Sequence, residues 1–131
     1  MLKALNIKGM HVKKVSTSEA KVKHYGEEYT RLQIDMDVAP FKRLQSLCPV
    51  CHEKCSGYDY KSAVPVSWRA NSFNGVPVFL HYRPKRIFCP KHGVKTEYLP
   101  WSDGNSRFTA SFNNEIAFMA LNAPEIIYVL L

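Results

Sequence analysis

The sequence predicts a mostly β fold with a single helix near its C-terminus, and three observations support this prediction. Residues 31–38 alternate between polar and apolar side chains, which is typical of a half-buried strand. Residues 64–71 and 76–83 are rich in β-branched and aromatic side chains and flank an Asn-Gly pair, which is a strong signal for a β-hairpin. Convincing helical periodicity occurs only after residue 108.

The first part of the chain, residues 1–40, predicts an N-terminal β-hairpin region. Residues 20–25 alternate weakly, Gly26 supplies a turn, and the stronger alternation follows, so residues 19–38 are expected to form a hairpin. Residues 10–15 are expected to add a third strand. Pro40 should end the element, because proline has no N–H to donate and restricts the residue before it.

The second part, residues 41–104, predicts an antiparallel pair formed by residues 64–71 and 76–83, with residues 72–75 as the turn. Pro65 and Pro77 each remove a ladder donor, so they suit the starts of strands or a sheet edge. Residues 86–89 then lead the chain into a short cysteine-containing turn.

The last part, residues 105–131, predicts a helical segment. Thr109 or Ser111 is suited to cap a helix whose apolar face carries Phe112, Ile116, Met119 and Ala120. Pro124 should stop that helix. The chain then ends in an apolar run, residues 125–131, which is typical of a segment that packs against something further along and predicts a truncated protein or a fragment.

The composition predicts one globular domain, or one domain with a short appendage. The chain has 131 residues, of which 46% are hydrophobic and 22% charged. It contains no run of 18 apolar residues and no signal-peptide pattern, so we expect a soluble cytoplasmic protein without a membrane partner. In that compartment its four cysteines are not expected to pair as disulfides.

Positive charge is concentrated in two stretches of the chain. Residues 1–25 hold six lysines against one glutamate, and residues 80–110 hold six lysines and arginines against two acidic residues. The formal net charge is +7. Two basic zones on a small domain favour a polyanionic partner such as DNA or RNA, although a merely solvated basic surface explains the charge equally well.

Four residues have the spacing of a metal site: Cys48 and Cys51 in one Cys-Pro-x-Cys turn, and Cys89 and His92 in a Cys-Pro-x-His turn. Three thiolates and one imidazole close a tetrahedral site for one structural Zn²⁺. Region 41–104 is therefore expected to consist of zinc-ribbon-like β-hairpins. Cys55 is also at ligand-like spacing from Cys51, and we interpret it as a packing or free thiol.

Other chemistries fit the pattern poorly. A thioredoxin-like dithiol requires a βαβ context, and a zinc deaminase requires a His-x-Glu motif before a Pro-Cys-x-x-Cys motif. No paired carboxylates and no Ser/His/Asp arrangement for hydrolysis are evident in the sequence. We therefore expect a protein that is not an enzyme and has no small-molecule substrate.

Because the sequence gives no sign of catalysis, the function that remains is the binding of another molecule. Cations surround the second turn and are interleaved with Tyr82, Phe88 and Trp101. A metal-pinned hairpin would present such cations to phosphates, while the three aromatic residues are expected to be core or to lie under loops. The candidate DNA-binding residues are Arg83, Lys85, Arg86, Lys91 and Arg107.

A series of short motifs covers residues 40–121 in a characteristic order: Cys48-Pro49-Val50-Cys51, Tyr58-Asp59, Trp68-Arg69, Gly75-Val76-Pro77-Val78-Phe79-Leu80, Arg83-Pro84-Lys85-Arg86, Cys89-Pro90-Lys91-His92-Gly93, Pro100-Trp101 and Ser106-Arg107-Phe108-Thr109. With these motifs the chain resembles the N-terminal zinc-finger region of bacterial insertion-sequence transposases of the ISL-three group. It departs from that family at His52, where glycine is usual, and at residues 70–72.

The resemblance implies a zinc-binding, DNA-binding module whose partner is double-stranded DNA at the terminal repeats of the element. It also implies that residues 105–131 begin a truncated helix-turn-helix and that the catalytic domain is not included. The alternatives are a zinc-stabilised interaction module, which binds a second copy or a full-length transposase, and an inactive transposase remnant.

Overall fold

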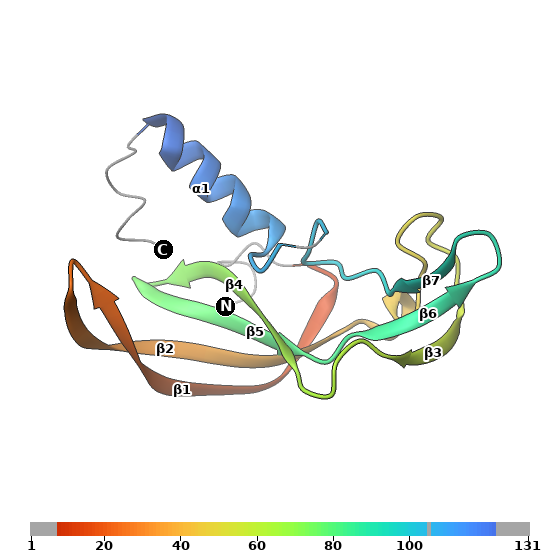
Figure 1. The fold of residues 1–131 in the computed structure, drawn as a ribbon, viewed down its shortest axis with the longest axis horizontal. Helices are drawn as coiled ribbons and strands as arrows, with labels where there is room; N and C mark the ends of the chain where they lie inside the picture. Colours follow the sequence, from red (N-terminus) through yellow and green to blue (C-terminus); the bar gives the residue numbers. More distant parts are fainter. Residues whose placement is uncertain (1–7, 105, 123–131) are drawn as a thin grey trace.

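Two β-sheets and one helix make up the fold, which a computed structural model describes over residues 8–104 and 106–122 (Figure 1). This architecture confirms the predicted fold class. The elements in chain order are β1 (Met10–His24), β2 (Glu27–Pro40), the 3-10 helix η1 (Lys42–Leu44), β3 (Ser56–Tyr60), β4 (Val66–Phe73), β5 (Val76–Tyr82), β6 (Lys85–Cys89), β7 (Gly93–Thr96) and α1 (Ala110–Asn122).

The long hairpin β1–β2 begins the larger sheet. Its strands pair antiparallel from Met10 opposite Pro40 to His24 opposite Glu27, and Pro40 ends β2 as predicted. The prediction of a separate third strand at residues 10–15 is wrong, because these residues are the first part of β1. The register shifts between Val12 and Lys14, and this bulge interrupts the polar-apolar alternation that would otherwise mark one continuous strand.

Strands from both halves of the chain form the larger sheet, whose order is β1-β2-β5-β4. The predicted hairpin β4–β5 is present, with its turn at Asn74 and Gly75, which have φ values of 50° and 78°. Strand β5 pairs in parallel with β2, from Ile34 opposite Val78 to Asp37 opposite His81. The division of the chain at residue 40 stays a prediction, but one sheet contains strands from both sides of that position.

One face of the larger sheet carries the main core. Alternate residues of its strands, together with residues from the segment after β7, are buried there: Met10, Met36, Val38, Trp68, Ala70, Val78, Leu80, Leu99 and Trp101. The Trp101 ring meets the rings of Trp68 and Tyr82 edge to face, each at a centroid distance of 5.5 Å. The other face of the sheet carries the intervening residues, most of which are polar.

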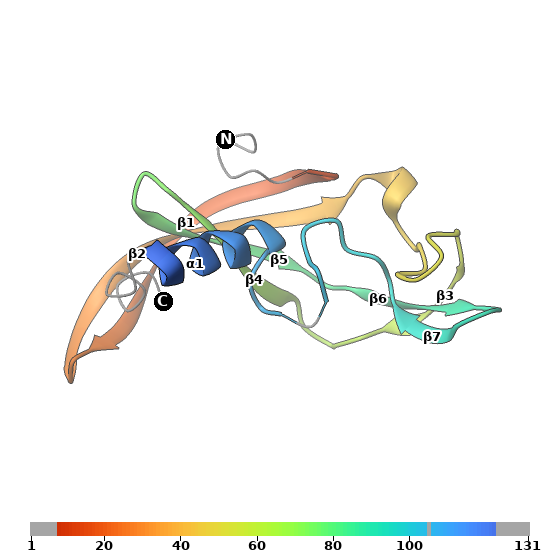
Figure 2. The same cartoon turned by 90° about the horizontal axis from the view of Figure 1, so that it is seen from above.

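The smaller sheet has the order β3-β6-β7 and lies at the opposite end of the molecule from the β1–β2 turn (Figures 1 and 2). Its buried cluster contains Ile87 and two cysteines, Cys48 and Cys89, with Cys51 and Cys55 packed against them. So small an apolar cluster provides little hydrophobic stabilisation for three strands.

Helix α1 begins beside β4, which it contacts, and from there rises away from the larger sheet (Figure 1). Of the two predicted caps, Thr109 is the one used, because its Oγ1 accepts a hydrogen bond from the Phe112 N–H at 3.2 Å. Phe112 is fully buried. No helix within residues 8–104 and 106–122 is long and apolar enough to cross a membrane. The predicted stop at Pro124 and the apolar run after it lie outside the described residues.

Candidate metal centre and nucleic-acid interface

The first metal-binding turn lies between η1 and β3. The Cys48 N–H donates to the Glu53 carbonyl at 3.0 Å, and the His52 N–H donates to the Cys48 carbonyl at 2.9 Å. These bonds fold residues 48–53 into a tight loop that points Cys48 and Cys51 the same way. His52 has a φ of 58°, a left-handed conformation that histidine tolerates better than most residues other than glycine.

The second metal-binding turn connects β6 to β7, where Cys89 pairs with Gly93 at the end of the ladder. Gly93 has a φ of 79° and occupies the position equivalent to His52. Burial raises the pKa of the Cys89 thiol, but hydrogen bonds from the backbone N–H groups of Lys91 and His92 and from neighbouring thiols outweigh it and lower the pKa to about 7. The turn therefore favours a thiolate at Cys89, which is the form that binds metals.

The two turns bring the four predicted ligands together. Their ligand atoms, the sulfurs of Cys48, Cys51 and Cys89 and a ring nitrogen of His92, all lie within 4.8 Å of one another, so the cluster could hold one metal ion. The Cys51 and Cys89 sulfurs are 3.8 Å apart, and His92 Nδ1 is 3.6 Å from Cys48 Sγ and 3.4 Å from Cys89 Sγ. A tetrahedral ion at about 2.3 Å from each sulfur requires sulfurs about 3.8 Å apart, so the arrangement fits a zinc-sized ion.

Cys55 lies beside this cluster but is not part of it. Its sulfur is 3.3 Å from the Glu53 carbonyl oxygen, and the side chain packs against the cluster of Cys48, Ile87 and Cys89. Burial, followed by the neighbouring cysteines, raises the pKa of the Cys55 thiol. Its environment is that of a packing thiol.

Two of the predicted DNA-binding arginines stack on exposed tyrosines of the smaller sheet. The Arg83 guanidinium lies 3.7 Å from the centroid of the Tyr60 ring, and the Arg86 guanidinium lies 5.3 Å from that of Tyr58. Both tyrosine side chains are about half exposed. Arg83 Nε also donates to the Ser62 carbonyl at 2.9 Å, and Arg86 forms a bidentate ion pair with Asp59. Both arginines therefore have partners within the smaller sheet and the loop after β3.

The other predicted DNA-binding residues are more scattered. Lys85 lies next to Arg86 in β6, opposite Tyr60, and exposed Lys91 lies in the second metal-binding turn, with its Nζ 4.0 Å from Glu53 Oε1. Arg107 is separate from both, because it lies in the segment before α1, where its carbonyl accepts the Arg69 N–H. The structure therefore groups Arg83, Lys85 and Arg86, whereas Arg107 comes from another segment and lines a pocket together with Pro84 and Lys95.

The aromatic residues near these cations have different environments. Trp101 is buried and Tyr82 is half-buried against the main core, as expected. Phe88 is 48% exposed, so the expectation of a core position is wrong for this residue. The reason is the alternation of β6, whose residues Ile87 and Cys89 face the metal cluster and leave the intervening side chain outward.

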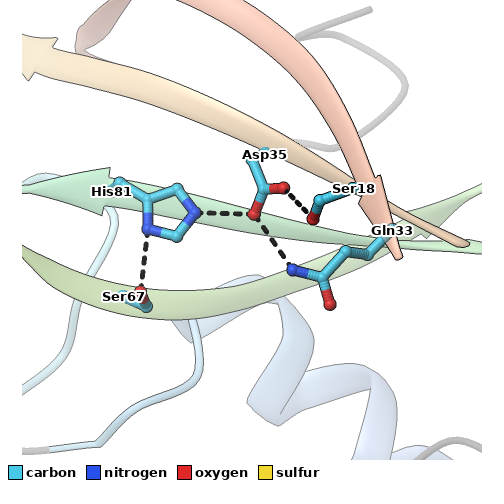
Figure 3. Close-up of polar contacts among 5 residues, drawn as sticks. All are labelled: Ser18, Gln33, Asp35, Ser67 and His81. Atoms are coloured by element: carbon cyan, nitrogen blue, oxygen red, sulfur yellow. Dashed lines mark hydrogen bonds and ion pairs between the residues drawn. The ribbon is translucent and has the colours of Figure 1, made fainter. Parts of the chain in front are cut away.

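A Ser/His/Asp network, which the sequence pattern did not reveal, crosses the polar face of the larger sheet (Figure 3). His81 Nε2 is 2.8 Å from Asp35 Oδ1, and His81 Nδ1 is 2.8 Å from Ser67 Oγ. The sequence did not indicate that these three side chains meet, and the expectation that the chain has no such arrangement for hydrolysis stays a prediction. The three residues come from β2, β5 and β4, and only the parallel pairing of β2 with β5 brings Asp35 to His81. No local motif could have indicated it.

Asp35 is the most heavily hydrogen-bonded member of this network. Besides His81, it accepts from Ser18 Oγ at 2.6 Å and from Gln33 Nε2 at 3.1 Å. Burial raises the pKa of the Asp35 carboxyl, but the three hydrogen bonds outweigh burial and leave that pKa below its ordinary value. The carboxylate form of Asp35 thus stabilises the strand order β1-β2-β5-β4.

Glu97 is a second residue whose structural role the sequence pattern did not indicate. It is only 2% exposed, and its carboxylate accepts hydrogen bonds from the Ser46 N–H at 3.2 Å, the Lys85 N–H at 2.7 Å and the Tyr82 hydroxyl at 2.9 Å. Burial and the Glu97 charge both raise the pKa of Tyr82. Glu97 thereby joins the end of β5, the start of β6 and the segment that leads to Cys48.

Comparison with known proteins shows a similarity to an insertion-sequence transposase. Over 84 residues the chain is 31% identical to the transposase for insertion sequence element IS1557 of Mycobacterium tuberculosis, in the strains CDC 1551/Oshkosh and H37Rv. The match covers 64% of this chain but only 19% of the transposase, so the chain spans about a fifth of its relative. No family model matches the chain, and no solved structure matches it significantly. The chain is therefore a distant relative of part of an insertion-sequence transposase.

Proposed function

We propose that the chain is a zinc-binding, DNA-binding module of an insertion-sequence transposase, of the kind found before the catalytic domain. The observation that carries this proposal is the similarity of 84 residues to the IS1557 transposase. The Cys48, Cys51, Cys89 and His92 cluster supports zinc as the ion, since a set of three thiolates and one imidazole is typical of structural zinc sites. Such an ion leaves no open coordination position for catalysis.

The smaller sheet offers a surface suited to DNA. Arg83 and Arg86 lie over exposed tyrosine rings, and Lys85 and Lys91 lie close to them in sequence. Positive charge attracts the phosphate backbone, while aromatic rings beside it provide apolar contact surface. In this proposal the zinc ion fixes the β6–β7 turn, so that the cations are presented on a rigid sheet. The bound DNA is the double-stranded end of the element, and the protein acts in the bacterial cytoplasm, at the nucleoid.

We also propose that the chain alone carries out no strand transfer. Cutting and joining DNA requires carboxylates that hold divalent ions at the reacting phosphate. Among the described residues the cluster of potential metal ligands contains cysteines and a histidine but no carboxylate. This composition supports the proposal that the described part of the chain is a binding module.

The test is fluorescence anisotropy of a labelled DNA duplex that carries the terminal repeat, titrated with the zinc-loaded protein over a series of salt concentrations. We expect binding that weakens steeply as salt rises and is lost after chelation of the metal. A folded, zinc-loaded protein that does not bind DNA at low salt would overturn the DNA-binding proposal.

A second candidate function is a protein-interaction module, and the exposed apolar residues of α1 favour it. Phe118 is 66% exposed and Leu121 is 86% exposed. Charge reversal by Arg83→Glu and Lys85→Glu separates the two candidates. The charge-reversed variant should lose DNA binding if the smaller sheet is the DNA interface, and its self-association should stay unchanged. Replacement of Phe118 and Leu121 by serine should have the opposite pattern.

A further inference from the structure

A pocket on the polar face of the larger sheet is lined by three arginines from distant parts of the chain. It has a volume of about 460 Å³ and is lined by Arg31, Ser67, Arg69, Phe79, Arg107 and Phe108. No carboxylate is among these lining residues. An arginine side chain only donates hydrogen bonds, so the pocket offers a surplus of positive charge and of donors.

The backbone explains how Arg107 reaches this place. The segment before α1 runs beside β4 and pairs with it, because the Arg69 N–H donates to the Arg107 carbonyl at 2.7 Å and the Thr109 N–H donates to the Arg69 carbonyl at 2.8 Å. Phe108 and Arg69 form a parallel bridge. Since β4, β5 and β2 are neighbours in the sheet, Arg69 and Arg31 approach the same pocket from the other side.

Two of the arginines are restrained in the pocket, and one of them, Arg31, has an unsatisfied buried donor. The Arg31 Nε is buried and has no hydrogen-bond partner among the described residues. The Arg69 guanidinium lies between the rings of Phe79 and Phe112, at 5.6 Å and 5.1 Å from their centroids. Burial, followed by the nearby charge of Arg31, lowers the pKa of Arg69, while Glu115 raises it. Glu115 is itself hydrogen-bonded to Asn71.

We propose that the pocket formed by Arg31, Arg69, Arg107 and Ser67 binds a phosphate group, and that in the functional complex this group is a phosphodiester of the DNA backbone. A phosphate presents several acceptor oxygens and a negative charge, which match guanidinium donors better than a single-charged carboxylate does. Binding supplies a partner for the buried Arg31 Nε and offsets the repulsion between Arg31 and Arg69. The DNA source rests on the proposed function, whereas the phosphate site does not.

The direct test follows the Nε–Hε signals of the arginines by NMR while inorganic phosphate is added to the zinc-loaded protein at constant ionic strength. We expect saturable shifts for Arg31, Arg69 and Arg107, and none for Arg43, an exposed arginine of η1 outside the pocket. Shifts that do not saturate, or that are equal at Arg43, would overturn the proposal.

Matched variants make the test specific. Arg31→Gln and Arg107→Gln should each weaken phosphate binding at least tenfold, and Arg43→Gln should leave it unchanged. Arg107 is exposed, so its variant should fold even if the Arg31 variant does not. Unaltered phosphate binding in a folded Arg107→Gln or Arg31→Gln protein would contradict the assigned pocket.

The source of the phosphate is tested with duplex DNA. If a backbone phosphate occupies the pocket, Arg31→Gln should reduce the slope of log K against log salt concentration by about 0.9, the value for one phosphate contact. An unchanged slope with intact DNA binding would refute the pocket as a DNA contact while the proposed function stands. Phosphate binding in a protein that does not bind DNA would instead refute the proposed function and assign the pocket to free phosphate.

Discussion

Cys89 is a buried member of the candidate metal centre. It is 1% exposed, and its sulfur is 3.8 Å from that of Cys51 and 3.4 Å from His92 Nδ1. We expect Cys89→Ser to lose the bound ion and to unfold β3, β6 and β7, because metal-binding energy in such a site is largely folding energy. The measurement is the zinc content of the purified variant together with the amide signals of the smaller sheet.

Cys55→Ser is the matched control for this prediction, because Cys55 lies next to the cluster without being part of it. We expect this variant to keep one equivalent of zinc and a native spectrum. Loss of zinc from Cys55→Ser, or full zinc occupancy in Cys89→Ser, would show that the ligand set is wrong.

Asp35 should make the stability of the larger sheet depend on pH. Its hydrogen bonds leave its folded-state pKa below the ordinary value of 3.8, so its contribution to stability is fully present well above pH 3.8 and is lost as pH falls through the folded-state pKa. We expect the difference in free energy of unfolding between the wild type and Asp35→Asn to shrink as the pH is lowered from 6 towards 3. Urea denaturation at each pH measures it. A difference that stays constant with pH would contradict this role.

Glu97 links the end of β5, the start of β6 and the segment before Cys48 by hydrogen bonds. Glu97→Gln replaces one acceptor oxygen with an NH₂ group. That group faces either the Ser46 N–H, which donates to Oε1, or the Lys85 N–H and Tyr82 hydroxyl, which donate to Oε2. Leaving buried donors unsatisfied costs about 1–3 kcal/mol, so we expect a loss of that size in the free energy of unfolding. Urea denaturation of the zinc-loaded protein measures it. Glu28→Gln, on the exposed hairpin, is the control and should change stability by less than about 0.5 kcal/mol.

The elements that the sequence predicted correctly are those specified by neighbouring residues. The Asn74-Gly75 turn determines the β4–β5 hairpin, and Thr109 caps α1 at the predicted place. The pairing of β2 with β5 could not be predicted, since it depends on the packing of apolar faces more than 40 residues apart. The continuity of β1 was missed because a bulge breaks its pattern.

The same distinction holds for the candidate sites. The metal cluster was predicted because short turns fix ligand spacing locally and two such turns complement each other. The Asp35, His81 and Ser67 network and the pocket of Arg31 and Arg69 were not, because their members come together only through the strand order. Intramolecular partners such as Asp59 for Arg86 likewise depend on cross-strand register.

At the scale of the whole molecule, the two sheets differ in what stabilises them. The main core contains nine buried residues of the described chain and lies on the larger sheet, whereas the second cluster contains Ile87 and two of the candidate metal ligands, Cys48 and Cys89. Because stabilisation scales with buried apolar area, we expect the larger sheet to be stable without metal and the smaller one to depend on it. In the proposed zinc-bound form, the ion would take the place of a hydrophobic core at one end of the protein.

Removal of the metal should therefore unfold only part of the molecule. We expect that a chelator abolishes the hydrogen-exchange protection of amides in β3, β6 and β7, while amides in β2 and β5 remain protected, since the core around Met36 and Leu80 does not include the metal ligands. Amide exchange followed by NMR before and after chelation measures this. Equal loss of protection in both sheets would mean that Glu97 and the continuous β5–β6 segment couple them into one cooperative unit. Unchanged protection in the smaller sheet would show that the ion is not structural.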